Sequence, residues 1–188
     1  MNRLRLVFAP ALILCSALAI FAESKEEKRA QARKKADETL QKLYKEHPSA
    51  RAAIESAVGY AVFNNGGAKI LIAGGGRGKG IAVENATQKV TYMKMREIQA
   101  GLGMGVKKFS VIFVFETKKA FDNFVDGNWE FGGQSTAAAK SGSGGGSLEG
   151  AGVVSDGVLM YQMTDKGVAL ELTAKSTKYS KDDDMNKP

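Results

Sequence analysis

The segment with the clearest capacity for chemistry is residues 74–80, where Arg77 and Lys79 stand among five glycines. Backbone N–H groups freed by glycine, together with cationic side chains, can surround an anion such as a phosphate. A nucleotide-binding loop of the Walker A type is excluded, because it needs glycine where Ala73 stands and serine or threonine where Gly80 stands. A tight turn between strands, with solvated charges, is the competing interpretation.

Residues that build most catalytic centres are scarce. The 188-residue chain has one cysteine, Cys15, and one histidine, His47. These counts exclude Cys/His and Ser/His catalytic pairs, zinc clusters and internal disulfides. No carboxylate spacing is typical of a glycosidase pair. We therefore expect no catalytic residue, no metal site, no cofactor and no enzymatic activity.

The N-terminus predicts export. Arg3 and Arg5 precede an uncharged, mostly apolar run over residues 6–22, after which the chain turns abruptly polar. Cleavage is expected after Ala22, with Ala19 as the alternative. The sequence thus predicts a signal peptide at residues 1–22 and a protein that is periplasmic or secreted, peripheral to the membrane.

Two other fates of this leader remain open. An uncleaved anchor is disfavoured because seventeen residues that include Pro10 are marginal for crossing a bilayer of about 30 Å. Acylation of Cys15, as in a lipoprotein, is disfavoured because the bulky Leu14 precedes it.

The formal net charge is +7, and loss of residues 1–22 would remove two arginines and no acidic residue, leaving +5. This excess favours anionic surfaces and does not call for nucleic acid.

The mature chain begins with a predicted helix over residues 24–45. Ser24 and Glu27 form a capping-box pattern, and one face carries Ala36, Leu40, Leu43 and Tyr44. The other faces are rich in cations, namely Lys28, Arg29, Arg33, Lys34, Lys35 and Lys42. We expect a solvated helix docked on the domain rather than one lying on a membrane, because the apolar stripe is thin and lacks Trp or Phe anchors. His47 is expected as a cap or turn residue before a short helix ending near residue 58.

From residue 59 the hydrophobic period changes to two, which predicts strands. A hairpin is expected from residues 60–63 to 68–73, turning through the Asn-Asn-Gly-Gly of 64–67. Further strands are expected at 81–84 and 89–96, the latter with Met93 and Met95 on one face. The apolar run 109–115 predicts a central strand covered on both faces.

The rest of the chain predicts one inserted helix and a final pair of strands. The helix is expected to span residues 117–127, with Thr117 as its N-cap. The Trp129 side chain, just after the helix, is expected to pack into the core. A long loop follows at 137–152, then strands at 158–163 and 168–173, then a polar tail expected to fray from residue 178. The predicted fold is α+β: N-terminal helices packed on a largely antiparallel β-sheet with one inserted helix, in one domain at 23–180 with a polar tail at 181–188.

Several segments together resemble a SYLF domain. They are GYAVF at 59–63, the basic glycine-rich run 74–80, FVFETKKAFDN at 113–123, WEFG at 129–132 and the closing region 157–179. Each is weak alone, but their order and spacing match over residues 36–179. The resemblance implies a lipid-binding module without enzyme activity: eukaryotic members bind phosphoinositides and in some cases actin, and exported bacterial relatives are regarded as envelope lipid-binding proteins.

The resulting hypothesis is reversible, non-catalytic binding of anionic phospholipid, of the phosphatidylglycerol or cardiolipin type, by an exported envelope protein. The resemblance points to Arg77 and Lys79 as headgroup-binding residues. Strand position and local positive charge add the residues Lys69, Lys94, Arg96, Lys107 and Lys108. The alternative is a protein-binding or structural envelope factor that has no lipid ligand and an unidentified protein partner.

Overall fold

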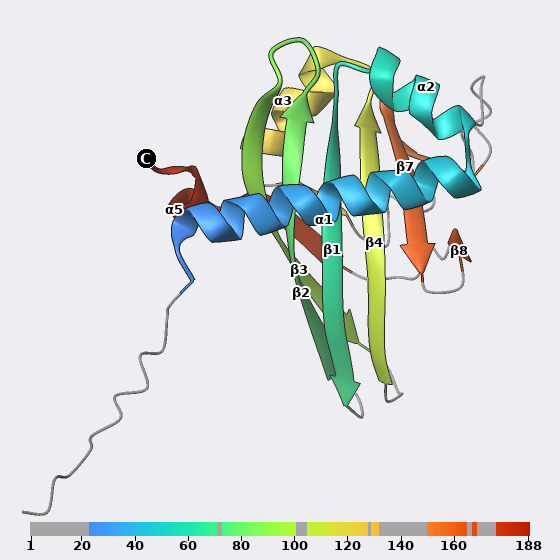
Figure 1. The fold of residues 1–188 in the computed structure, drawn as a ribbon. Helices are drawn as coiled ribbons and strands as arrows, with labels where there is room; N and C mark the ends of the chain where they lie inside the picture. Colours follow the sequence, from blue (N-terminus) through green and yellow to red (C-terminus); the bar gives the residue numbers. More distant parts are fainter. Residues whose placement is uncertain are drawn as a thin grey trace, which may run out of the picture.

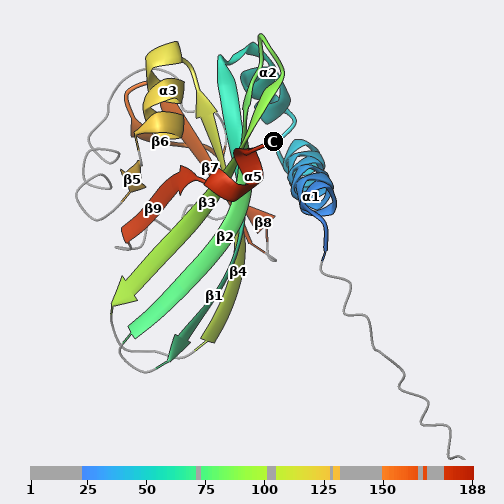
Figure 2. The same cartoon turned by 90° about the vertical axis from the view of Figure 1, so that its left-hand side faces the viewer.

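The structure is a computed structural model that describes residues 23–70, 73–100, 105–127, 129–131, 150–164, 167–168 and 176–188. One curled sheet runs through the molecule, with a long helix crossing one face and a short helix on the other (Figures 1 and 2). The fold is α+β, as predicted. The predicted signal peptide, most of the predicted loop 137–152 and the predicted strand beyond Val168 lie outside the described residues.

Helix α1 (Lys25–Glu46) confirms the predicted N-terminal helix and its capping box. The Ser24 hydroxyl accepts a hydrogen bond from the Glu27 backbone N–H (3.1 Å), and the Glu27 carboxylate accepts one from the Ser24 backbone N–H (2.7 Å). His47 is the C-cap, and α2 (Ser49–Ser56) follows. Within the described ranges, no helix combines the length and the apolarity needed to cross a bilayer.

The described strands are all antiparallel and form one sheet in the order β5-β9-β3-β2-β1-β4-β7-β6, with β8 paired to β7. Their bounds are β1 (Gly59–Ile70), β2 (Ala73–Glu84), β3 (Lys89–Ala100), β4 (Gly105–Phe115), β5 (Glu130–Phe131), β6 (Gly152–Ser155), β7 (Val158–Thr164), β8 (Gly167–Val168) and β9 (Ser176–Lys181).

Two turn predictions are wrong. Residues 64–67 are not a hairpin turn, because β1 continues through them to Ile70. Residues 74–80 are not a turn either; they lie inside β2 and pair with β1 and β3. Here glycine serves close packing instead of chain reversal: a β-carbon at Gly80 would lie 2.3 Å from the Val62 carbonyl oxygen and 2.5 Å from the Phe63 ring.

The sheet has a hydrophobic core on each face. Against α1 and α2, the strands contribute side chains such as Val62, Ile112 and Tyr161 to a cluster that includes Leu40 and Leu43. Against α3 (Lys118–Asp126), they contribute an aromatic cluster. Its rings are those of Phe63, Phe113, Phe115, Phe121, Phe124, Trp129 and Tyr179, many of them edge to face. The predicted central strand, inserted helix and core position of Trp129 are therefore confirmed.

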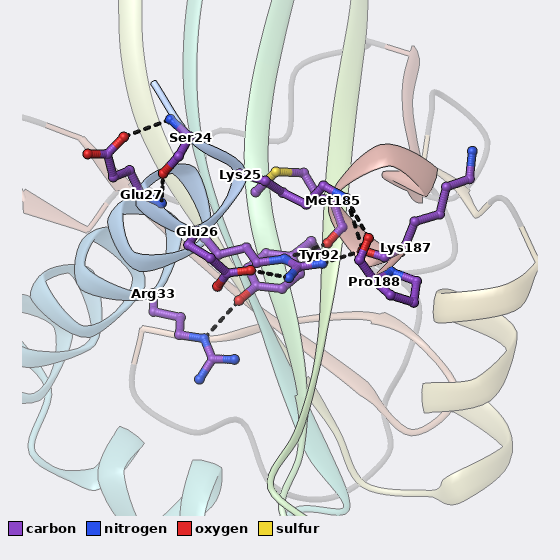
Figure 3. Close-up of polar contacts among 10 residues, drawn as sticks. Ser24, Lys25, Glu26, Glu27, Arg33, Tyr92, Met185, Lys187 and Pro188 are labelled. Carbon is purple, nitrogen blue, oxygen red and sulfur yellow. Dashed lines mark hydrogen bonds and ion pairs between the residues drawn. The ribbon is translucent and has the colours of Figure 1, made fainter. Parts of the chain in front are cut away.

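The C-terminal segment is ordered, so the prediction that it frays from residue 178 is wrong. Strand β9 pairs with β3, and α5 (Asp183–Asn186) docks beside the start of α1. The Asn186 side chain exchanges two hydrogen bonds with the Tyr92 backbone, at 2.9 and 2.7 Å. The Arg29 Nε atom donates to the Met185 carbonyl oxygen (2.9 Å), and Arg33 Nε donates to the Tyr92 hydroxyl (2.9 Å). We call these five residues the latch; most of them are seen in Figure 3.

Candidate functional site

A groove of about 520 Å³ lies between the first half of α1 and strands β2 and β3. Its charged lining is mostly cationic. The cations are Lys28, Lys35, Arg77, Lys79, Lys94 and Arg96, and the acids are Glu23 and Asp182. We call it the basic groove.

The strand cations of the groove face one another in matched pairs. In the β2–β3 register Arg77 lies opposite Arg96, and Lys79 lies opposite Lys94. Opposed side chains on one face have β-carbons about 5 Å apart, and like charges in this arrangement destabilise a sheet. The structure thus keeps two adjacent repulsive pairs on one patch, an arrangement that a bound anion would relieve.

The charges of the groove are not neutralised internally. Among the described residues, none of the six groove cations has an acidic partner within ion-pair distance. Some cations elsewhere are paired; Lys118, for example, contacts Asp122 and also Glu84 (3.4 Å). The hydrogen bond to Asp122 is the main reason that the pKa of Lys118 lies above its ordinary value.

Helix α1 sorts its cations between two sides. Lys28 and Lys35, seven residues and so about two turns apart, line the groove. Arg29 and Arg33, one turn apart, lie over the Tyr92 ring, with their guanidinium carbons 5.7 and 5.8 Å from the ring centroid. The buried residues Ala36, Leu40 and Leu43 hold the helix on the sheet, so its docking fixes where the groove lysines lie.

A polar cluster borders the groove on β1. The Asn64 side-chain oxygen Oδ1 accepts hydrogen bonds from the Thr39 hydroxyl (3.0 Å) and the Ser110 hydroxyl (2.8 Å). Asn64 also lines the groove and lies opposite Lys79 in the β1–β2 register. The hydrogen bonds from α1 and β4 hold this side chain in place at the groove wall.

The two acids of the groove differ in their contacts. The Asp182 carboxylate caps α5 by accepting a hydrogen bond from the Met185 backbone N–H (3.4 Å). Glu23 directly precedes the capping box of α1. Within that box, the Ser24 backbone N–H and, to a smaller degree, its hydroxyl hold the pKa of Glu27 below its ordinary value.

A second groove of about 450 Å³ continues from the first across β9. It shares Lys94 and Arg96 and is also lined by Lys178 and Lys181. Lys178 lies opposite Arg96 in the β3–β9 register, which extends the row of cations. Lys181, however, forms an ion pair with Asp126. The second groove is therefore the more neutralised of the two.

The structure brings four of the seven sequence-predicted site residues together, namely Arg77, Lys79, Lys94 and Arg96. The backbones of Lys69, Lys107 and Lys108 lie in β1 and β4, where Lys107 pairs with Gly67 and Lys108 with Gly66. Their side chains lie outside what the structure describes, and their role stays a prediction. Lys28 and Lys35 were not among the predicted site residues; their sequence signal was only the excess of cations on α1.

Comparison with known proteins gives a family model and a curated relative. The family model described as "Las17-binding protein actin regulator" (Ysc84) matches residues 96–188. "Beta cell expansion factor A" of Aeromonas veronii is 34% identical over 150 residues, which cover 80% of this chain and 56% of that relative. The chain belongs to the SYLF domain family.

The SYLF family is known in eukaryotes for lipid and actin binding, and its members are generally non-enzymatic binding domains. Of the charged groove residues of this SYLF domain, Arg96 and Asp182 lie within the stretch that the family model matches. The chain spans little more than half the length of the curated relative that it matches.

Proposed function

We propose that this SYLF domain binds anionic phospholipid headgroups reversibly in the basic groove, as an exported protein of the bacterial envelope. One observation carries the proposal: six cations line one groove, and none of them is ion-paired to another described residue. A phosphate group supplies the missing negative charge.

The expected strength follows from the number of cations. Each Lys or Arg near an anionic membrane contributes about 1 kcal/mol, and salt screens the contribution. Several acting together give useful, salt-sensitive and reversible attachment. The charged lining also favours a headgroup over a protein partner, because a protein-docking surface is expected to have an apolar centre.

Co-sedimentation with vesicles tests the proposal. The purified protein is mixed at low salt with vesicles of phosphatidylcholine alone or with added phosphatidylglycerol. We expect retention by the anionic vesicles that falls as salt is added. Loss of Arg77 and Lys79 together, by Arg77→Ala and Lys79→Ala, should weaken binding by about 2 kcal/mol, or about 30-fold.

A matched control separates the groove from net charge. Lys45 and Lys119 are exposed and lie outside the groove, so the double variant Lys45→Ala, Lys119→Ala loses the same charge but should bind almost normally. The melting temperature of the control variant should equal that of the parent, and that of the groove variant should be equal or slightly higher, because it loses one cation of each repulsive pair. Equal retention by anionic and zwitterionic vesicles would refute the proposal.

Export is tested separately. Fractionation of the producing bacterium should place the protein in the envelope or the medium, and N-terminal sequencing should start at Glu23. Intact mass spectrometry distinguishes cleavage after Ala22 from cleavage after Ala19 and from acylation at Cys15. An intact Met1 in the cytoplasmic fraction would contradict export.

A further inference from the structure

The cations on the floor of the basic groove form two separate rows. Arg77 and Arg96 make one row across β2 and β3, and Lys79 and Lys94 make the next. The rows are two residues apart along the strands, which is about 6.8 Å. This spacing is larger than a single phosphate group, so each row has room to hold a phosphate of its own.

Helix α1 adds two cations above the floor, spaced across the strands and not along them (Figure 1). Lys28 and Lys35 are separated by seven residues, which places them about 10.5 Å apart along the helix axis. Both line the same groove. The helix thus adds positive charge over the floor, while the division into two rows comes from the sheet side.

The balance of charges in the groove also favours a ligand with two phosphates. The lining residues carry six cations and two acids. One phosphodiester brings one negative charge and relieves the repulsion within one row, whereas the other row keeps its two opposed cations. A ligand with two phosphates on one molecule relieves both rows, and its second contact is intramolecular, which raises affinity without new contacts.

We infer that the basic groove selects a lipid whose headgroup carries two phosphate groups joined by a short linker, as cardiolipin does, over lipids with one phosphate. This inference rests on the proposed function. It adds that the preference depends on how the charges are linked and not on the charge of the membrane alone.

The test compares vesicles of equal charge. One set contains cardiolipin in phosphatidylcholine, and the other contains twice as many phosphatidylglycerol molecules, so that the two sets carry the same anionic charge. We expect about tenfold or greater affinity for the cardiolipin vesicles. Equal affinity for both sets overturns the inference and leaves the proposed function standing. Retention no better than on phosphatidylcholine alone refutes the proposed function itself.

Two variants with the same loss of charge test the rows. The variant Lys79→Ala, Lys94→Ala deletes one whole row, and its ratio of cardiolipin to phosphatidylglycerol affinity should fall to about one. The variant Arg77→Ala, Lys79→Ala leaves one cation in each row, so it should bind both vesicles more weakly but keep a preference for cardiolipin. Equal ratios in the two variants would mean that total charge alone sets the preference, and would overturn the inference.

Two further measurements complete the experiment. Arg77→Ala with Arg96→Ala deletes the other row and should abolish the preference in the same way, which guards against a folding defect in one variant.

Inorganic pyrophosphate added to the protein with cardiolipin vesicles tests a soluble source of the same chemistry. We expect it to displace the protein weakly, and displacement as strong as that by excess cardiolipin vesicles would overturn the assignment to a lipid.

Discussion

The latch and the basic groove lie along the same half of α1, yet their cations are in opposite situations. In the latch, Arg29 donates hydrogen bonds to the carbonyl oxygens of Met185 and Lys187, and Arg33 donates to the Tyr92 hydroxyl. In the groove, Lys28 and Lys35 have no ion-pair partner among the described residues. The latch cations contribute to stability, whereas the groove cations are available to a ligand.

Position in the fold, and not residue type, assigns the role of a charge, because the groove also contains the arginines Arg77 and Arg96. Residues 29 and 33 are one turn apart and face α5 and the Tyr92 ring. Residues 28 and 35 are two turns apart and face the groove cations of β2 and β3. A change in the latch should therefore alter unfolding more than binding, and a change in the groove should do the reverse.

The largest effect is expected from removal of the latch aromatic. Tyr92→Ala deletes a ring that is 6% exposed and should lower the free energy of unfolding by about 3 kcal/mol or more, because it leaves a cavity beneath α1. Tyr92→Phe removes only the hydroxyl that accepts from Arg33 and should cost about 1 kcal/mol. Urea unfolding measures both, and equal losses in the two variants would show that the ring itself contributes nothing.

The next effect concerns close packing within β2 instead of the charge of the groove. Gly80→Ala places a β-carbon against the Val62 carbonyl and the Phe63 ring and should cost about 1–3 kcal/mol through overpacking. Lys79→Ala, at the neighbouring exposed position, should not lower the free energy of unfolding, because it removes one member of a repulsive pair, while it weakens vesicle binding. If Gly80→Ala melts like the parent, β2 does not need glycine for close packing at this point.

Asp182 lines the groove and is hydrogen-bonded to the latch residues Met185 and Asn186, so its substitution can separate the two regions. Asp182→Asn keeps a side chain that caps helices equally well but removes an acid from the groove, so vesicle affinity should rise by about fivefold with no change in stability. Asp182→Ala should give the same gain in affinity and lose about 0.5–1 kcal/mol of stability, because α5 loses its cap. The two variants would contradict this division if their melting temperatures were the same.

The smallest effect is expected at the start of α1. Ser24→Ala removes the hydroxyl that caps the helix and should lower the free energy of unfolding by about 0.5–1 kcal/mol, with groove affinity unchanged.

The pKa of Glu27 is lower in the folded protein than its ordinary value. Its contribution is thus present above that ordinary value and is lost as the pH falls through the lowered pKa. Unfolding measured against pH should show a smaller acid-side loss in Glu27→Gln than in the parent.

Elements with local signals were predictable from the sequence. The capping box at Ser24, the cap at Thr117 and the apolar run of β4 each depend on residues within a few positions of one another. The glycines of 64–67 and 74–80 misled the prediction, because glycine is common both in turns and where backbones or rings approach closely. Only the pairing of β1 with β2 and β4 distinguishes these two uses.

The sequence by itself determined the approximate boundaries of α1 and α3, the central strand, the α+β class and four of the residues that line the groove, because caps, periodicity and charge depend on residues close together in the chain. Only the tertiary structure decided that Lys28 and Lys35 join them, that the polar C-terminal segment docks as β9 and α5, and that Arg77 and Lys79 meet Arg96 and Lys94 in two rows. The reason is physical: strand register and helix docking result from contacts between residues far apart in the chain, which no local pattern specifies.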